Sequence, residues 1–160
     1  MRHTISVLVD NEPGVLSRVT GLFSGRGFNI ESLCVAATME ADVSRITLVS
    51  VGSEMIIEQI IKQLRKLINV IKVVDLTQTD HVEREMALVK VKAEDRQRAE
   101  VLRIADIFRC RVVDVSPNTY TLEVTGNSEK LNAVLGLFKS IGIQEVVRTG
   151  TLAIQRSKKD

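Results

Sequence analysis

The strongest constraint on the fold of this chain is an order of predicted elements that occurs twice in its 160 residues. Strands are indicated by alternating, β-branched residues, and helices by apolar residues at three- and four-residue spacing. In the first half these patterns predict strand, helix, strand, strand, helix and strand. The elements lie at 4–10, 15–25, 29–37, 44–51, 54–68 and 70–76.

The second half repeats that order after a polar segment at 77–81 that shows no periodicity. Strands are predicted at 86–91, 111–115, 119–124 and 144–147, helices at 101–108 and 131–138, and a short additional strand at 151–154. This order predicts an α+β fold of two ferredoxin-like (βαββαβ) domains, each an antiparallel sheet with two helices on one face. We place the domains at 1–77 and 83–160, joined by a linker at 78–82.

Short polar residues mark where several of these elements begin or turn. Ser53 and Ser128 stand where helix N-caps are expected, because a serine hydroxyl accepts a hydrogen bond from a first-turn N–H. Ser116-Pro117-Asn118 is a favourable turn between two strands. These residues support the predicted element boundaries.

One face of the first sheet is predicted to be too apolar for water. The helices cover only one face, and Leu8, Val49 and Val51 fall on the other. Two sheets that join edge to edge or back to back would cover these residues and the unpaired strand edges together. We therefore expect a homodimer.

The sequence lacks the motifs that catalysis and cofactor binding usually require. The two histidines, His3 and His81, fall at the terminus and in the predicted linker, where we expect surface side chains. No phosphate-binding loop, HExxH motif or paired cysteines occur. Gly21, Gly25 and Gly27 lie within or after a helix, so they do not form a dinucleotide motif. We expect no catalytic residue, no cofactor site and no metal site.

Composition and termini argue against several partners. Twenty-two basic and twenty acidic residues give an evenly spread net charge of +2, which does not predict nucleic-acid binding. No apolar run approaches the ~18 residues of a membrane span, and the N-terminus enters a strand without a secretory signal. Cys34 and Cys110 lack metal-type spacing and are predicted to be free, inert thiols of a reducing compartment. We expect a cytoplasmic protein with neither a nucleic-acid nor a membrane partner.

The segment Asp10–Leu16 (DNEPGVL) is the place where the sequence favours binding of a small ligand. Pro13 and Gly14 suit the central positions of a type II turn, in which the second residue takes a positive φ. The first N–H groups of the following helix have no intrahelical partner, so a carboxylate can accept hydrogen bonds there. Asn11 offers a donor and an acceptor to an amino-acid zwitterion. A turn without a ligand accounts for the same residues, and the equivalent junction at 93–97 lacks proline and glycine.

Several runs of residues carry a resemblance to a known family. Asp10–Arg18 resembles the loop of ACT domains, the amino-acid-sensing modules of metabolic enzymes. Gly21–Leu33 (GLFSGRGFNIESL) closely resembles the regulatory small subunit of acetolactate synthase, also called acetohydroxyacid synthase. Residues 82–90 and 148–150 are similar to that family as well, so the resemblance covers essentially the whole chain.

The resemblance implies a non-catalytic regulatory subunit of branched-chain amino-acid synthesis. Such subunits dimerise through an N-terminal ACT domain, bind and activate the large catalytic subunit of acetolactate synthase, and confer feedback inhibition by valine. Thiamine diphosphate, Mg²⁺ and FAD then belong to the catalytic partner, and this chain is expected to hold none of them.

The resemblance also implies that the effector binds between the ACT domains of two protomers. Valine's carboxylate would meet the N–H groups near Gly14, its ammonium an asparagine, and its isopropyl group an apolar wall. Cys34 departs from the threonine that relatives often have at its position, which leaves the effector's identity open. The implied effector residues are Asn11, Gly14, Val15, Leu16, Asn29, Ile30, Val35 and Ala36.

The alternative is a stand-alone amino-acid-sensing ACT protein that regulates another enzyme or transcription. A transcriptional role would require a DNA-binding element, and the sequence shows no helix-turn-helix and no basic arm. The two hypotheses differ in whether acetolactate forms only when the catalytic subunit is added.

Overall fold

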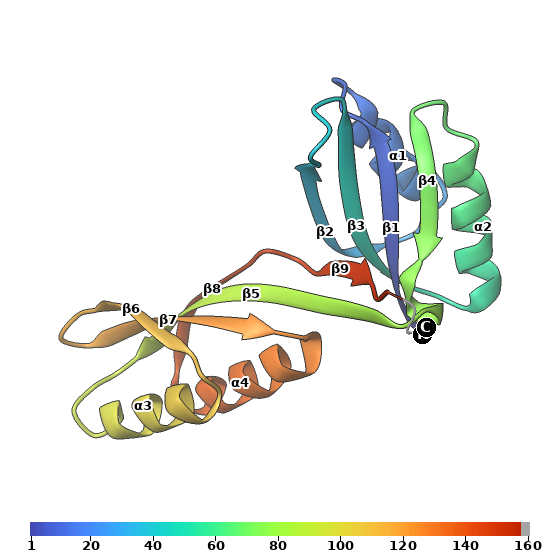
Figure 1. Ribbon diagram of the computed structural model, residues 1–160. Coiled ribbons are helices and arrows are strands. Elements are labelled where there is room, and N and C mark those ends of the chain that lie inside the picture. The colour runs from blue at the N-terminus through green and yellow to red at the C-terminus, as the bar shows by residue number, and fades with distance from the viewer. Residues whose placement is uncertain (158–160) are drawn as a thin grey trace. The chain divides into compact units, whose positions relative to one another are not determined.

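Alternating apolar residues build a four-stranded antiparallel sheet from the N-terminal half of the chain. In a computed structural model that describes residues 1–157, its strand order is β2-β3-β1-β4, with two helices on one face (Figure 1). The predicted element order is confirmed. The elements are β1 (Arg2–Asp10), α1 (Val15–Gly25), β2 (Ile30–Ala37), β3 (Val43–Val51), α2 (Glu54–Arg65), β4 (Val70–Asp75) and the 3-10 turn η1 (Leu76–Gln78).

The core of this part lies between the sheet and its two helices. Ile5, Val7 and Val9 of β1 face the helices and are at most 2% exposed. Burying each such side chain contributes about 1.5–3 kcal/mol, so packing rather than helix propensity holds the helices in place. The helices bury a matching stripe of Val15, Val19, Phe23, Ile57, Ile60 and Leu64.

The two ends of α2 differ in how well the sequence predicted them. Ser53 is the N-cap, as predicted, because its side chain accepts a hydrogen bond from a first-turn N–H. The prediction that the buried stripe continues to Ile68 is wrong, since the helix ends at Arg65 and Ile68 is 93% exposed. A hydrogen bond from the Leu67 N–H to the Leu64 carbonyl turns the chain toward β4, so helical spacing no longer applies.

The second half repeats this topology strand for strand. Its order is β6-β7-β5-β8, in which each strand occupies the place of β2, β3, β1 and β4, respectively. Val89, Leu122 and Phe138 are fully buried in its core. The prediction of two ferredoxin-like domains is confirmed. The elements are β5 (His81–Lys92), α3 (Arg98–Ile107), β6 (Arg111–Val115), β7 (Thr119–Gly126), α4 (Ser128–Ile141) and β8 (Ile143–Arg148).

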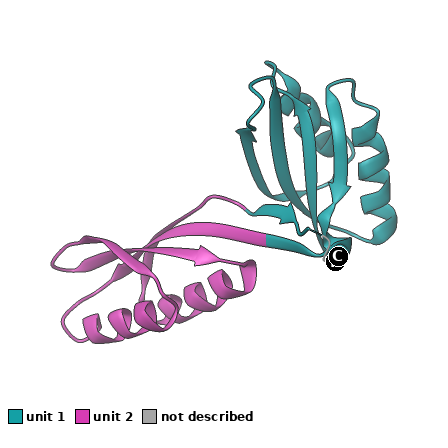
Figure 2. Cartoon of the chain, viewed as in Figure 1, with its two compact units in different colours: residues 1–82, 151–160 teal, residues 83–150 magenta. Residues whose placement is uncertain are grey.

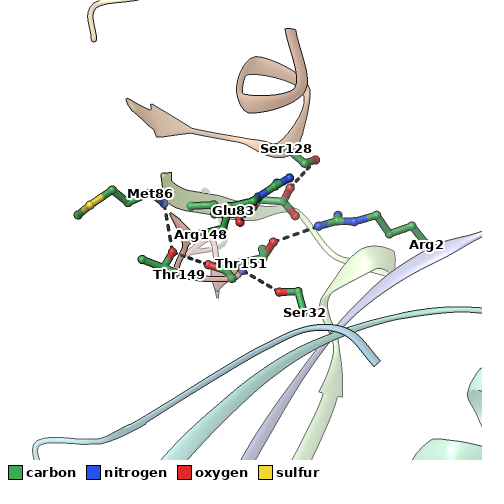
Figure 3. Close-up of polar contacts among 10 residues, drawn as sticks. Arg2, Ser32, Glu83, Met86, Ser128, Arg148, Thr149 and Thr151 are labelled. Atoms are coloured by element: carbon green, nitrogen blue, oxygen red, sulfur yellow. Dashed lines mark hydrogen bonds and ion pairs between the residues drawn. The ribbon is translucent and has the colours of Figure 1, made fainter. Parts of the chain in front are cut away.

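The N-cap of α4 is Asn127 rather than the predicted Ser128. The Asn127 side chain accepts a hydrogen bond from the Lys130 N–H at 3.0 Å. Ser128, the first helical residue, instead donates to Glu83 Oε1 at 3.0 Å (Figure 3). Serine and asparagine cap helices about equally well, so this tertiary contact and the local backbone decide between neighbours.

The compact units of the chain differ from the predicted domain boundaries at two places. Unit 1 contains residues 1–82 and the described segment 151–157, and unit 2 contains residues 83–150 (Figure 2). We expected 151–157 in the C-terminal domain. We also expected a linker at 78–82, but the end of η1 and the start of β5 occupy it. Just before it, the Thr77 hydroxyl accepts a hydrogen bond from the Thr4 N–H at 2.8 Å, which ties η1 to β1.

The segment 151–157 belongs to unit 1 because it lies against the helix-free face of that sheet. The Thr151 N–H donates to Ser32 Oγ at 2.9 Å, and the Thr151 hydroxyl accepts from the Arg2 guanidinium at 3.0 Å (Figure 3). A pocket of ≈160 Å³ on this face is lined from both sides, by Ser6 and Leu8 of β1 and by Ile154 of the segment. The segment includes the predicted short strand, found as β9 (Leu152–Gln155), which pairs with β5.

This segment covers part of the surface that we expected a second protomer to cover. Val49 is fully buried in the single chain, whereas Val51 is 51% exposed. Leu8 is partly buried. The sequence pattern located the apolar face correctly, but part of its cover comes from the same chain.

Unit 2 contains a bidentate ion pair between the neighbouring strands β5 and β8. The Arg148 guanidinium donates to Glu85 Oε1 at 2.7 Å and to Oε2 at 2.9 Å. This hydrogen bonding raises the pKa of Arg148 above its usual value, so the guanidinium stays charged. Glu85 is 5% exposed, so its carboxylate depends on this partner.

We expect Arg148→Met to destabilise unit 2 by about 2 kcal/mol. The cost of removing one member of a buried pair is about 3–5 kcal/mol, reduced here because Arg148 is itself partly exposed. Lys90→Met is the matched control, because Lys90 pairs with Glu145 at the surface, where such pairs contribute under about 1 kcal/mol. Denaturant unfolding of both variants measures the difference, and equal losses would contradict it.

Candidate functional site

The loop after β1 forms the predicted turn. Gly14 has φ 85° and ψ −9°, and the Val15 N–H donates to the Glu12 carbonyl at 3.4 Å, which closes a turn around Pro13 and Gly14. The predicted positive φ is confirmed. A Cβ on Gly14 would meet no atom within 4 Å, so backbone conformation rather than crowding favours glycine here.

α1 begins directly after Gly14, and two N–H groups of its first turn have no acceptor among the described residues. The Arg18 N–H donates to the Gly14 carbonyl at 3.1 Å, which starts the helical ladder. Gly14 provides no side-chain cap, and the first turn contains no acidic residue. Within residues 1–157, no hydrogen bond takes up the N–H groups of Leu16 and Ser17. The helix start therefore presents two donors and the positive end of its dipole to an anion.

Hydrogen bonds attach the loop to the turn between β2 and β3. The Asn11 N–H donates to the Asp42 carbonyl at 2.8 Å, and Asn11 Nδ2 donates to the Ala41 carbonyl at 2.9 Å. Asn11 Oδ1 accepts no hydrogen bond from the described residues. The acceptor end of this amide is thus the part that suits a ligand ammonium.

Val15 and Leu16 contribute to the helix start in different ways. Val15 is 3% exposed and packs in the core of unit 1, so its side chain is closed to a ligand and only its backbone lies in the loop. Leu16 is 40% exposed and turns its side chain toward solvent. Leu16 can therefore provide both an N–H group and apolar contact.

The eight predicted effector residues lie at two opposite ends of the unit 1 sheet. β1 and β2 are both antiparallel to β3, so they run parallel to each other. Leu8 of β1 and Ala36 of β2 both pair with Arg45 of β3. Val35 and Ala36 therefore lie at the end of the sheet where β1 leads into the loop. Ile30 pairs with Ser50 at the other end, about 20 Å away along the strand. A single chain therefore does not bring Asn29 and Ile30 to the loop.

Sequence reasoning missed Asn69, a polar residue that is 7% exposed between α2 and β4. Its Nδ2 donates to Asp10 Oδ2 at 3.2 Å and to Glu12 Oε2 at 3.5 Å, and its Oδ1 accepts from the Arg18 guanidinium. Its carbonyl accepts the Asp10 N–H at 2.9 Å. No local pattern marks Asn69, because its partners lie more than fifty positions earlier in the chain.

The histidines and cysteines of the chain lie outside this loop. The prediction of a surface position is wrong for His3, whose side chain is 1% exposed because β1 starts at Arg2 and directs position 3 inward. His3 Nδ1 lies 2.9 Å from Asp75 Oδ2. Cys34 and Cys110 are free, and burial raises the pKa of the Cys110 thiol. Among residues 1–157, no group of three His, Cys, Asp or Glu side chains is arranged to hold a metal ion, and no described helix is long and apolar enough to cross a membrane.

Comparison with known proteins first defines the class of this chain. The model of the AHAS small subunit-like ACT domain matches residues 5–72. Unit 1, with its glycine loop and open helix start, is therefore an ACT domain. A second family model, described as the small subunit of acetolactate synthase, matches residues 84–157.

Relatives then define the family. The chain is 53% identical over 156 residues to the acetolactate synthase small subunit of Aquifex aeolicus, covering 97% of this chain and 81% of the relative. It is 50% identical over 159 residues to the probable acetolactate synthase small subunit of Archaeoglobus fulgidus, covering 99% of both. The crystal structure of the small subunit from Thermotoga maritima matches with a TM-score of 0.89 at 38% identity, covering 99% of both chains. The chain belongs to the acetolactate synthase small-subunit family.

Proposed function

We propose that this chain is the non-catalytic regulatory subunit of an acetolactate synthase, which activates the catalytic subunit and confers feedback inhibition by valine. The observation that carries the proposal is the open start of α1 behind Gly14, in a chain that belongs to the small-subunit family. Thiamine diphosphate, Mg²⁺ and FAD would be held by the catalytic subunit. The subunits would work together in the cytoplasm.

The loop suits each chemical part of a small α-amino acid. The carboxylate accepts hydrogen bonds from the Leu16 and Ser17 N–H groups, where the helix dipole also favours a negative charge. The ammonium donates to Asn11 Oδ1. Leu16 and Val35, both 40% exposed, offer apolar contact to an aliphatic side chain.

A second copy of the chain would complete this site with Asn29 and Ile30. β2 is the last strand on its side of the sheet, so its outer edge is available for pairing with another strand. If two β2 strands pair antiparallel about a two-fold axis, Ile30 of each copy lies near Ala37 of the other. Such a homodimer brings the partner's strand start to the loop. Effector binding would then alter the arrangement of the two protomers, and this change would affect the catalytic subunit that they bind.

Reconstitution with the catalytic subunit tests the proposal. We expect the isolated chain to form no acetolactate from pyruvate, the catalytic subunit alone to be less active than the mixture, and valine to inhibit only the mixture. The mixture without valine and the catalytic subunit with valine are the controls. Acetolactate formation by the isolated chain, or a mixture no more active than the catalytic subunit, would contradict the proposed role and favour a stand-alone ACT protein.

A further inference from the structure

Two carboxylates beside the loop are potential competitors of an anionic ligand at the start of α1. Glu12 lies two residues before Gly14, and acidic side chains near a helix N-terminus are attracted to its unpaired N–H groups and its dipole. Among residues 1–157, no side chain caps α1. The Asp10 and Glu12 carboxylates instead accept hydrogen bonds from Asn69 Nδ2.

We propose that Asn69 is a positioning residue of the effector site, which holds the Glu12 carboxylate away from the α1 N-terminus so that the carboxylate of an amino acid can occupy it. This inference rests on the proposed function, because it concerns the same amino-acid site. Asn69 does not touch the effector in this arrangement. It acts through Glu12, and it keeps the N–H groups of Leu16 and Ser17 open.

The amide of asparagine suits this position because its surroundings carry both signs of charge. Its NH₂ group donates to two carboxylates, and its oxygen accepts from the Arg18 guanidinium in the first part of α1. Aspartate would lose the donor, and alanine would lose both functions. Because Asn69 is 7% exposed, bulk water cannot readily replace the lost hydrogen bonds.

Valine titration of the full-length chain by calorimetry tests this role. We expect Asn69→Ala to weaken valine binding about fivefold to tenfold, because the released Glu12 carboxylate competes for the helix start. Adding Glu12→Gln to Asn69→Ala should restore the affinity to within about twofold of the unaltered chain, because a glutamine has no charge to compete. Glu12→Gln alone should change the affinity by less than about twofold. A purely structural role of Asn69 would not be rescued at Glu12.

Asn69→Asp is a second test variant. It preserves the contact with Arg18 and so supports folding. Its carboxylate repels Glu12, so we expect weaker valine binding than in Asn69→Ala, and again rescue by Glu12→Gln. Asn127→Ala is the matched control, because it removes another hydrogen-bonded asparagine, the N-cap of α4 in unit 2. That variant should lose stability while its valine affinity stays unchanged.

The outcomes separate this role from the proposed function. Unchanged affinity in both Asn69 variants, or no rescue by Glu12→Gln, overturns the positioning role alone. Absence of valine binding by the unaltered chain overturns the proposed function, and the positioning role with it. Loss of affinity in both Asn69 variants with rescue at Glu12 supports the role.

Discussion

Gly14→Asp should give an acetolactate synthase that this subunit still activates but that valine no longer inhibits. The new carboxylate would stand beside the first N–H groups of α1, where its negative charge and its acceptor oxygens compete with the valine carboxylate. Losing two charge-assisted hydrogen bonds, at about 1.5–3 kcal/mol each, predicts valine binding weaker by at least about a hundredfold. Inhibition curves of the reconstituted enzyme and calorimetry on the subunit measure the effect.

Folding should survive this change. A Cβ at Gly14 meets no atom within 4 Å, so the cost is the positive φ, on the order of 1 kcal/mol. Gly14→Ala is the matched control, because it carries the same backbone cost without a carboxylate and should retain most of the valine inhibition. Normal valine inhibition of the aspartate variant, or equal loss in both variants, would show that the helix start does not hold the effector carboxylate.

Ending the chain at residue 150 should destabilise unit 1 by roughly 3–5 kcal/mol, the sum of lost burial and hydrogen bonds. The truncation removes both hydrogen bonds of Thr151 and the cover that the segment provides to the helix-free face. Val49, which the intact chain buries fully, lies on that face. The core of unit 2 lies within residues 87–143 and should keep its stability.

Hydrogen exchange, read separately for the two units, measures this effect. A chain that ends at Ser157 is the control, because it keeps every described contact of the segment, including the ion pair of Arg156 with Asp80. Protection should fall in β1 and β3 of the shorter chain, and in β5 where it pairs with β9, and stay unchanged in β6 and β7. Equal protection in both truncated chains would mean that 151–157 adds no stability to unit 1.

The loop that faces the proposed effector was predictable because its geometry is local. Pro13-Gly14 defines a turn through the φ preferences of two adjacent residues, and the helix after it follows from apolar spacing within one segment. The site as a whole was not predictable from one chain. Asn29 and Ile30 were placed by resemblance, and the structure puts them at the far end of the sheet, where only a second copy could bring them to the loop.

Local sequence patterns were sufficient to predict the order of elements, the repeated ferredoxin-like topology and the positive φ of Gly14, because periodicity and backbone preference act over a few neighbouring residues. Three features came from folding alone: 151–157 joins unit 1, Asn127 rather than Ser128 caps α4, and Asn69 donates to the Asp10 and Glu12 carboxylates beside the loop. Each of these depends on partners distant in sequence or on a choice between equally suited neighbours. Local patterns carry no information about contacts that form only when the chain is folded.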